Sequence, residues 1–398
     1  MGNEIELSTV ITDIAAGPFG SNLKVECFVP SGFPIIDGAN LKGYKVTDNV
    51  TKFVTEEKAR SLSRSIAHRG DVIVTISGTI GQIAYIPEDS LYDEYLCSQR
   101  QFRVSFDSSM VYVPYLVFYF HTFEGQNKIL SFANQTGVPA LSQPLKNFKK
   151  IHLCLPSFQE QRRIASIVET LNDKIENNIK INDNLYAQAK AIFDTHFINI
   201  DAIPAGWRKG NLLDIANYLN GLAMQKFRPQ GNEIGLPVLK IKELRQGSCD
   251  DSSELCSLRI KPEYIIHDGD VIFSWSGSLL VDIWCGGTCG LNQHLFKVTS
   301  DIYDKWFYYL WTAHHLARFI AIAADKATTM GHIKREELAK AEVLIPCEED
   351  YTSLTSIMQP IFELIISNRI EGRKLAVLRD ELLPKLMSGE IDVSAVQL

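Results

Sequence analysis

One stretch of the sequence, residues 155–197, predicts a single long helix and reads LPSFQEQRRIASIVETLNDKIENNIKINDNLYAQAKAIFDTHF. Ser157, followed three residues later by Glu160, forms the capping pattern with which many helices begin. Apolar residues then recur at intervals of three and four, and no proline or glycine interrupts them before Pro204. A helix of about 38 residues would be roughly 57 Å long, because each residue adds about 1.5 Å.

This helix ends the first copy of a tandem repeat. Residues 153–156 align with residues 343–346 at an offset of 190, and the two helical stretches keep that offset. Upstream, the tetrapeptide Gly-Asp-Val-Ile occurs at 70–73 and again at 269–272, while residues 99–104 resemble residues 293–298. The sequence separation between equivalent residues of the two copies therefore shrinks along the front part of the repeat and is then constant. We expect a duplicated unit whose front part has variable loops and whose rear part has a fixed length.

The expected fold is α+β. Two mixed, mainly β globular lobes are separated by two long antiparallel, coiled-coil-like helices, which makes the chain a pseudo-twofold tandem repeat. Inside the lobes we also expect one helix from Pro114 to Leu130 and its counterpart from Trp306 to Ala323. The predicted boundaries are 1–157 for the first lobe, 158–200 for the first helix, 201–348 for the second lobe and 349–398 for the second helix.

The apolar sides of the two helices predict a pairing seam. Asn178 and Asn368 lie on it at matching places, and an asparagine on such a seam fixes the register at some cost in stability. Gly372 and Pro384 should weaken or kink the second helix, which we expect to begin near Tyr351. The predicted seam consists of Ile164, Leu171, Ile175, Asn178, Leu185 and Ile192, facing Ile357, Ile361, Leu364, Asn368, Leu375 and Leu382.

Composition sets bounds on the class of protein. The 398 residues are 45% hydrophobic, which suits two or three globular cores and excludes a mainly disordered chain. The formal net charge of −7 is spread so that both lobes are nearly neutral, which leaves DNA binding open. The longest apolar run, 111–120, is too short for a membrane span, and no signal peptide is readable. Eight scattered cysteines predict free thiols, no metal site and a cytoplasmic location.

Several motifs resemble Type I restriction-modification specificity subunits (the HsdS family). Residues 155–164 resemble the opening of the family's central conserved region, and residues 378–391 resemble its C-terminal signature. Residues 17–24, and residues 70–73 with 77–78, resemble pieces of its target recognition domains. The resemblance covers essentially the whole chain in the order lobe, helix, lobe, helix. One departure is residues 347–350, where the second helix lacks the Ser-Phe-Gln-Glu pattern.

The resemblance implies a non-catalytic subunit that binds double-stranded DNA. Each lobe, as a target recognition domain, would read one half of an asymmetric bipartite site. The helices would set the spacer and dock two N6-adenine methyltransferase subunits and, through them, the ATP-dependent restriction subunits. S-adenosylmethionine and ATP are expected on those partners, with no cofactor, catalytic residue, metal or membrane for this chain. In agreement, the sequence has no Asn/Asp-Pro-Pro-Tyr/Phe motif and no Gly-x4-Gly-Lys-Ser/Thr loop.

Two other classes of function stay open from the sequence. The first is a fused restriction-modification enzyme with a cryptic nuclease or methyltransferase site, because the acidic residues of a nuclease form a loose motif. The second is a protein-interaction scaffold whose paired helices bind other helices and whose lobes never contact DNA.

Candidate DNA contacts are residues with hydrogen-bond donors or positive charge on predicted loops, since such groups reach base edges and phosphates. The Gly-Asp-Val-Ile motifs are expected to be structural, and Trp275 could stack on DNA. In the first lobe the candidates are Ser21, Asn22, Lys24, Lys42, Tyr44, Lys45, Ser77, Thr79, Gln99, Arg100, Gln101, Asn134, Gln135, Thr136 and Gln143. In the second lobe they are Lys226, Arg228, Lys240, Lys242, Arg245, Ser276, Gln293, His294, Thr328, Thr329, His332, Lys334 and Arg335.

Overall fold

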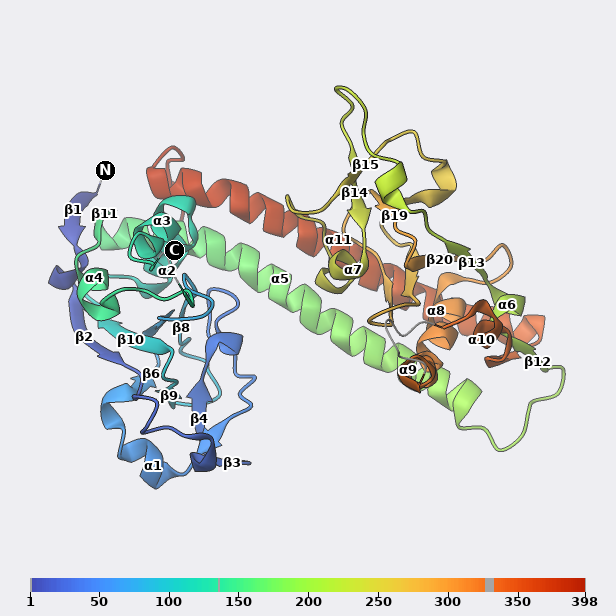
Figure 1. The fold of residues 1–398 in the computed structure, drawn as a ribbon, viewed down its shortest axis with the longest axis horizontal. Helices are drawn as coiled ribbons and strands as arrows, with labels where there is room; N and C mark the ends of the chain where they lie inside the picture. The colour runs from blue at the N-terminus through green and yellow to red at the C-terminus, as the bar shows by residue number, and fades with distance from the viewer. Residues whose placement is uncertain (1, 135–136, 326–332, 398) are drawn as a thin grey trace. The chain divides into compact units, whose positions relative to one another are not determined.

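The computed structural model describes residues 2–134, 137–325 and 333–397, and the chain divides into two compact units (Figure 1). Unit 1 comprises Met1–Leu171 and Val377–Leu398, and unit 2 comprises Asn172–Ala376. Each unit contains one mainly β lobe and part of both long helices, so the predicted α+β repeat is confirmed. The predicted four-part division at residues 157, 200 and 348 stays a prediction.

The lobe of unit 1 is built on two sheets. The antiparallel sheet has the order β2 (Ile11–Ala16), β10 (Gln101–Phe106), β7 (Val72–Thr75), β8 (Ile83–Tyr85). The second sheet has the order β3 (Phe28–Val29), β5 (Phe53–Val54), β4 (Phe33–Ile36), β9 (Glu94–Cys97), β6 (Ile66–His68), with β4 and β9 parallel. The lobe is completed by the pair β1 (Asn3–Glu6) with β11 (His152–Leu155) and by α1 (Glu56–Arg60), α2 (Val113–His121), α3 (Phe123–Leu130) and α4 (Pro144–Lys149).

The lobe of unit 2 repeats this plan. Its antiparallel sheet has the order β13 (Asn217–Asn220), β20 (Leu295–Thr299), β17 (Val271–Ser274), β18 (Leu280–Ile283). Its second sheet has the order β15 (Leu255–Cys256), β14 (Leu236–Leu239), β19 (Cys289–Leu291), β16 (Ile265–Ile266), and β14 is parallel to β19 as β4 is to β9. The pair β12 (Arg208–Asn211) with β21 (Glu342–Ile345) matches β1 with β11, and the helices are α6 (Leu212–Ile215), α7 (Ile241–Gln246), α8 (Lys305–His314), α9 (Leu316–Asp325) and α10 (Arg335–Ala339).

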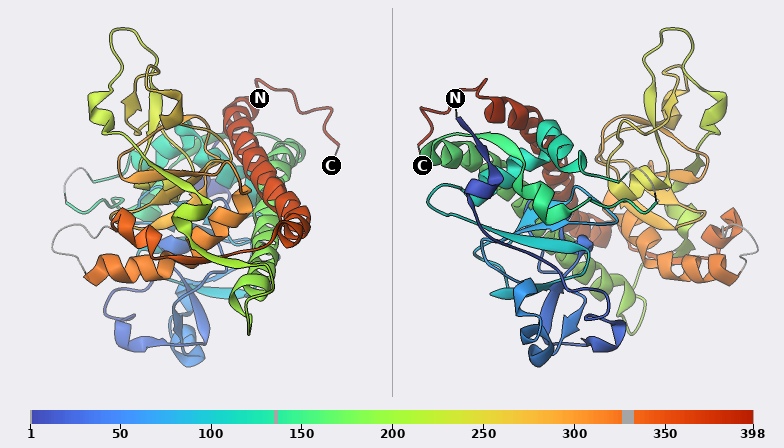
Figure 2. Two further views of the ribbon diagram at one scale, coloured as in Figure 1. Left: turned by 90° about the vertical axis from the view of Figure 1, so that its right-hand side faces the viewer. Right: turned by 60° about the vertical axis from the view of Figure 1, so that its left-hand side comes forward.

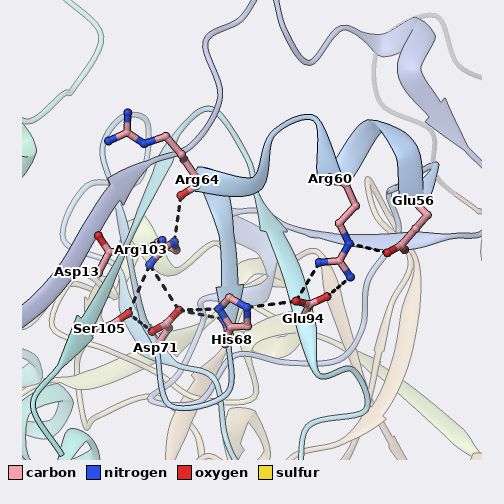
Figure 3. A network of polar contacts seen from close by, with 9 residues as sticks. All are labelled: Asp13, Glu56, Arg60, Arg64, His68, Asp71, Glu94, Arg103 and Ser105. Atoms are coloured by element: carbon pink, nitrogen blue, oxygen red, sulfur yellow. Dashed lines mark hydrogen bonds and ion pairs between the residues drawn. The ribbon is translucent and has the colours of Figure 1, made fainter.

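The Gly-Asp-Val-Ile motif of unit 1 is structural, as predicted. Gly70 makes the turn with a φ of +83°, and the Asp71 carboxylate accepts a hydrogen bond from the His68 backbone N–H at 2.9 Å. The same carboxylate accepts from Ser105 Oγ at 2.5 Å and lies 4.0 Å from Arg103 NH1 (Figure 3). Arg103 also pairs with Asp13 at 2.6 Å, and this hydrogen bond holds the pKa of Asp13 below its usual value.

Unit 2 builds the same turn with a different cation. Gly269 has a φ of +89°, and Asp270 accepts from the His267 N–H at 2.9 Å. Lys297, on the strand equivalent to that of Arg103, pairs with Asp270 at 2.8 Å. The repeated motif therefore joins two neighbouring strands through an aspartate and a cation in each lobe.

The predicted helix from Pro114 to Leu130 is wrong as a single element. Thr122 has an extended backbone and its Oγ1 accepts from the Gly125 N–H at 3.1 Å, so α2 ends and α3 begins there. A side-chain hydroxyl that caps a new helix favours such a break. The counterpart is likewise two helices, α8 and α9, divided at His315.

The two long helices are α5 (Phe158–Phe193) and α11 (Glu348–Ser388). Ser157 Oγ accepts from the Glu160 N–H at 3.3 Å, which confirms the predicted N-cap, and a π-helical turn, Asp194–Ile198, follows α5. Helix α11 begins three residues before the expected Tyr351 and includes Gly372 and Pro384. It ends before Gly389, whose φ of +75° suits the residue after a helix. No helix in the described part of the chain is both long and apolar enough to cross a bilayer.

Within unit 2 the two long helices run antiparallel (Figures 1 and 2), and asparagine side chains join them. Asn178 Nδ2 donates to the Asn368 carbonyl at 3.4 Å and to Glu371 Oε2 at 2.7 Å. Asn182 Nδ2 donates to the Ile365 carbonyl at 3.2 Å, and Asn368 Nδ2 donates to Asn182 Oδ1 at 3.0 Å. Asn178 and Asn368, which the sequence places at matching positions of the seam, thus contact each other across it, while Asn182 had not been predicted.

Part of the predicted seam is wrong on α11. Ile357 and Leu364 are 51% and 45% exposed, whereas Leu354, Met358, Phe362 and Ile365 are buried. The buried stripe is displaced from the predicted one because α11 must also cover the unit 2 lobe. On α5, Ile164 is buried, and Leu171, Ile175, Leu185 and Ile192 are half-buried, as are Ile361, Leu375 and Leu382 on α11.

Both long helices contribute to both hydrophobic cores. In unit 1, Ile164 and Val168 of α5 and Leu383 and Leu386 of α11 join a core that includes the aromatic side chains of α2. In unit 2, Phe193 of α5 joins a core that includes the aromatic side chains of α8, with Leu354, Met358 and Phe362 of α11. A displacement of either helix along its axis would therefore disturb packing in both units.

Removing the charge of Asp71 should destabilise the lobe of unit 1. Asp71→Asn would leave the guanidinium of Arg103, whose side chain is 10% exposed, with only the exposed Asp13 as a charged partner. We expect the free energy of unfolding, measured by urea denaturation, to fall by about 3 kcal/mol. The matched control is Asp93→Asn, which breaks a surface pair with Arg69 and should change it by less than about 0.5 kcal/mol. Equal effects of the two substitutions would contradict the buried-pair interpretation.

Candidate nucleic-acid interface

Five predicted contact residues of unit 1 come together around one pocket. Strands β7 and β10 are antiparallel, so the turn that follows Thr75 lies beside the segment that precedes Gln101. The Ile76 N–H donates to the Arg100 carbonyl at 2.6 Å. The pocket has a volume of about 540 Å³, and the predicted residues that line it are Ser77, Thr79, Gln99, Arg100 and Gln101.

The loop with Ser21, Asn22 and Lys24 reaches the rim of this pocket. Leu23 and Val25, which alternate with these residues along the chain, line the pocket. Gly17 is required where the loop begins, because its N–H donates to the Gln101 carbonyl at 2.8 Å and a methyl group in place of its hydrogen would overlap the carbonyl oxygen of Ser98. The three predicted residues are exposed.

A second loop lies against the same turn. The Gly78 N–H donates to the Pro139 carbonyl at 2.9 Å, and the Leu141 N–H donates to the Ile76 carbonyl at 2.8 Å. Asn134, at the start of this loop, is exposed and its N–H donates to the Ala140 carbonyl. Gln143 is exposed too, with a left-handed φ of 41° at the N-cap of α4. The predicted contacts Gln135 and Thr136 lie outside the described residues.

Lys42, Tyr44 and Lys45 lie elsewhere in unit 1. This segment runs beside β8, where Tyr85 N–H donates to the Tyr44 carbonyl at 3.0 Å and Lys45 forms a bridge to Tyr85. The Tyr44 ring packs edge-on against Phe118, with the Arg379 guanidinium 5.3 Å from its centre, and burial raises the pKa of its hydroxyl. Tyr44 is therefore a packing residue, and the prediction that it contacts DNA is not supported by its surroundings.

In unit 2 the equivalent turn gathers Ser276, Gln293 and His294. Ser276 Oγ and His294 Nδ1 are 3.0 Å apart, and Gln293 Nε2 lies 3.4 Å from His294 Nε2. Trp275 packs its ring over Phe296 with a centroid distance of 5.6 Å, and its indole N–H donates to Asn220 Oδ1 at 3.0 Å. The side-chain oxygen of Gln293 is buried, and no described residue donates a hydrogen bond to it.

The predicted basic residues of unit 2 are partly neutralised. Lys240 pairs with Glu254 at 2.6 Å and Lys242 pairs with Asp250 at 3.4 Å. The hydrogen bond from Lys240 is the main reason that the pKa of Glu254 is lowered. The remaining predicted cations on this side of the lobe, Lys226, Arg228 and Arg245, are exposed.

The chain segment that begins at Ile333 lies beside the turn at Trp275. The Ile333 N–H donates to the Trp275 carbonyl at 3.1 Å, which corresponds to the bond from Leu141 to Ile76 in unit 1. Lys334 and Arg335, both predicted contacts, follow directly and are exposed at the start of α10. The predicted contacts Thr328, Thr329 and His332 lie outside the described residues.

Sequence reasoning missed several residues of the unit 1 pocket region, among them Asp37, Lys52 and Ser98. Thr75, Gln82 and Gly38 line the pocket, and Phe19, on the loop between Gly17 and Ser21, is 83% exposed. The flanking glycines in a Gly-Pro-Phe-Gly sequence signal a turn that could display the phenyl ring. No comparable signal marks Gln82, because its place beside Thr75 and Gln101 depends on strand pairing.

The two sites share a backbone arrangement and differ in chemistry. Unit 1 presents the guanidinium of Arg100 beside its Ser77–Gly78 turn, and unit 2 presents the imidazole of His294 beside its Ser276–Gly277 turn. Such turns offer hydrogen-bond donors and acceptors to a polyanionic ligand, and each would favour a different arrangement of partner atoms.

Comparisons with known proteins place this arrangement in context. A family model described as "Type I restriction modification DNA specificity domain" matches the chain twice, at residues 30–186 and 204–376. The Type I restriction enzyme MjaIX specificity subunit of Methanocaldococcus jannaschii is 25% identical, over 96% of this chain and 92% of the relative. The Type I restriction enzyme HindI specificity subunit of Haemophilus influenzae is 18% identical, over 78% and 84%. The crystal structure of a Type-I restriction-modification system S subunit from M. genitalium has a similar fold, with a TM-score of 0.58 and 13% identity over 96% of this chain and 95% of that one.

Gly17 should be required for the unit 1 site to form. A methyl group at this position would overlap Ser98 and force the 17–24 loop away from the pocket, so we expect Gly17→Ala to lower the free energy of unfolding by about 1–3 kcal/mol. Gly43→Ala is the matched control, because an added methyl group there meets no described atom within 4 Å. Urea denaturation of both variants provides the test, and a Gly17→Ala protein as stable as Gly43→Ala would show that the loop is not held in this way.

Proposed function

The chain belongs to the family of Type I restriction modification DNA specificity domains, and from this membership we propose how its two lobes divide the reading of DNA. It is a non-catalytic specificity subunit that recognises DNA within a Type I restriction-modification complex, with methyltransferase and restriction subunits as partners. The lobe of unit 1 reads one half of a bipartite site, and the lobe of unit 2 reads the other half. The site is asymmetric because the two lobes carry different side chains.

One observation supports the assignment of one half-site to each lobe. The antiparallel sheets of the two lobes share strand order and register, and both lobes have the aspartate turn, yet the lobes differ in the residues at equivalent positions of the exposed turns. The loop that opens at Gly17 in the first lobe continues as Pro-Phe-Gly-Ser, whereas the loop that opens at the equivalent Gly221 continues as Leu-Ala-Met-Gln, and Thr79 stands where the second lobe has Ser278. A common frame with different polar groups would dock in the same way and select different sequences.

The long helices would set the spacer between the half-sites and dock the methyltransferase subunits. Their antiparallel pairing and their contributions to both cores support the first role. The second role is supported by apolar side chains that the helices leave exposed, since such side chains commonly mark protein interfaces. They are Ile179 and Ile181 on α5, and Ile357, Leu364, Val377 and Leu378 on α11.

S-adenosylmethionine and ATP would be bound by the partner subunits. The sequence supports this by lacking the methyltransferase and P-loop motifs. A cytoplasmic location is supported by the eight cysteines, all of which are free thiols. No observation favours a fused enzyme with its own nuclease or methyltransferase site, or a scaffold that never meets DNA.

Exchanging one lobe tests the proposal. We expect a chain whose residues 1–157 come from a relative to change only one half of the methylated sequence, because each lobe reads DNA with its own residues. The measurement is sequencing of methylated adenines in cells that express the exchanged chain with its methyltransferase. Exchange of residues 201–348 is the matched control and should change only the other half. A single exchange that altered both halves would contradict the two-reader proposal.

A further inference from the structure

The floor of the unit 1 pocket is made of polar side chains from three adjacent strands. Gln101 begins β10 opposite Thr75 of β7, and the Thr75 N–H donates to the Gln82 carbonyl at 3.0 Å just before β8. Gln101 is only 2% exposed, so it does not project from the surface to reach a base edge. The pocket is concave, and any partner of Gln101 must enter it.

Hydrogen bonds fix the direction of both amides. Gln82 Nε2 donates to the Gly38 carbonyl at 3.0 Å, so its Oε1 accepts from Thr75 Oγ1 at 3.1 Å. The Arg100 N–H donates to Ser98 Oγ at 3.4 Å, and that hydroxyl donates in turn to Gln101 Oε1. Both amide oxygens are therefore engaged. Within the described chain, no group accepts a hydrogen bond from Gln101 Nε2, which is left as a donor.

The charges around the pocket favour an anion. Arg100 is exposed on its rim, and no carboxylate among the described residues pairs with its guanidinium. Among the described residues, the only acidic side chain that lines the pocket is Asp37, whose carboxylate accepts from Lys52 Nζ at 2.6 Å and from the Ala39 N–H at 2.9 Å. The pocket thus offers hydrogen-bond donors and the positive charge of Arg100.

The fold does not require these amides. In unit 2 the same three strand positions are held by Ser274, Leu280 and Leu295, with the same pairing between strands. Burying amides in place of leucines has a desolvation cost, which hydrogen bonds inside the protein only partly offset. The Gln82 amide is accounted for by its bonds to Gly38 and Thr75, whereas the donor of Gln101 has a use that the shared fold does not explain.

We propose that this pocket binds one sugar-phosphate group of the bound DNA. The contact fixes the position of the first lobe along the duplex and does not read a base. A phosphate only accepts hydrogen bonds and projects from the duplex, whereas base edges are recessed in the grooves. Gln101 Nε2 and the Arg100 guanidinium donate to the phosphate oxygens, and the apolar wall at Leu23 and Val25 contacts the sugar. This rests on the proposed function, and it assigns the predicted DNA contact of Gln101 to the phosphate backbone.

The test uses the complex of the full chain with its methyltransferase, bound to its cognate duplex at a series of salt concentrations. Arg100→Gln should weaken binding about tenfold and reduce the slope of log affinity against log salt by about 0.9, as expected for one lost phosphate contact. Gln101→Leu, which installs the residue of the second lobe, should weaken binding to duplexes with correct and altered first half-sites by the same factor. Lys128→Gln is the matched control, because Lys128 already pairs with Glu124 and donates to His152, and it should leave the slope unchanged.

A scan with single methylphosphonate groups locates the anchor. For the unchanged chain, neutralising one phosphate at the first half-site should weaken binding, and that sensitivity should disappear in Arg100→Gln. The methylated motif should be the same for all three variants. A changed first half of the motif in Gln101→Leu, or an unchanged salt slope in Arg100→Gln, would overturn the phosphate seat. Failure of the proposed function differs from both, because the unchanged complex would then not methylate a split motif.

Discussion

The antiparallel register of α5 and α11 is the constraint on which the rest of the structure depends. Asn178 and Asn182 are 2% and 8% exposed, and their amides bond to Asn368, Ile365 and Glu371 of the opposite helix. A shift of one turn would separate these groups and leave buried amides without partners, which is costly in a low-dielectric seam. Because both helices also supply side chains to both cores, the asparagines fix the packing of each unit as well as the pairing.

The two copies of the repeat share one backbone arrangement and differ in the side chains that they expose. In both lobes an aspartate after a left-handed glycine pairs with a cation on the neighbouring strand, and a glycine at the start of the next loop passes close to a carbonyl. These features are structural and are shared by the two copies. The loops that follow these glycines differ, with Pro-Phe-Gly-Ser after Gly17 and Leu-Ala-Met-Gln after Gly221, and this difference would let one chain recognise an asymmetric site. The phosphate seat proposed for unit 1 extends the contrast, since the second lobe has leucines where Gln82 and Gln101 stand.

Much of the fold could be predicted from the sequence because it depends on local periodicity and on self-similarity. The capped helix at residue 158, the duplicated lobe and the matching places of Asn178 and Asn368 on the helix seam all follow from spacing along the chain. The break at Thr122 and the buried stripe of α11 did not follow, because they depend on a side-chain cap and on tertiary contacts with the lobe. For the candidate site, sequence reasoning found the turns at Ser77 and Ser276 from the repeat. It could not tell that Gln101 is buried while the neighbouring Arg100 is exposed. Nor could it tell that Tyr44 packs against other side chains, since burial is set by strand pairing between distant residues.

The role of the helix pair is tested most directly by the length of the spacer in the methylated motif after both helices are lengthened together. Three heptads inserted between Leu171 and Asn172, with three more between Ala376 and Val377, leave the asparagine pairs, the Lys174–Glu371 pair and the Arg373–Asp268 pair intact and keep the apolar seam in phase. The insertion adds about 31.5 Å, close to one turn of DNA, so the half-sites would face the same side of the duplex as before. We expect both half-sites to be unchanged and the spacer to grow by about nine base pairs. The same insertion in α5 alone should destroy the pairing and abolish methylation. A folded, active complex with its original spacer would contradict the claim that the register of the helix pair sets the reading distance.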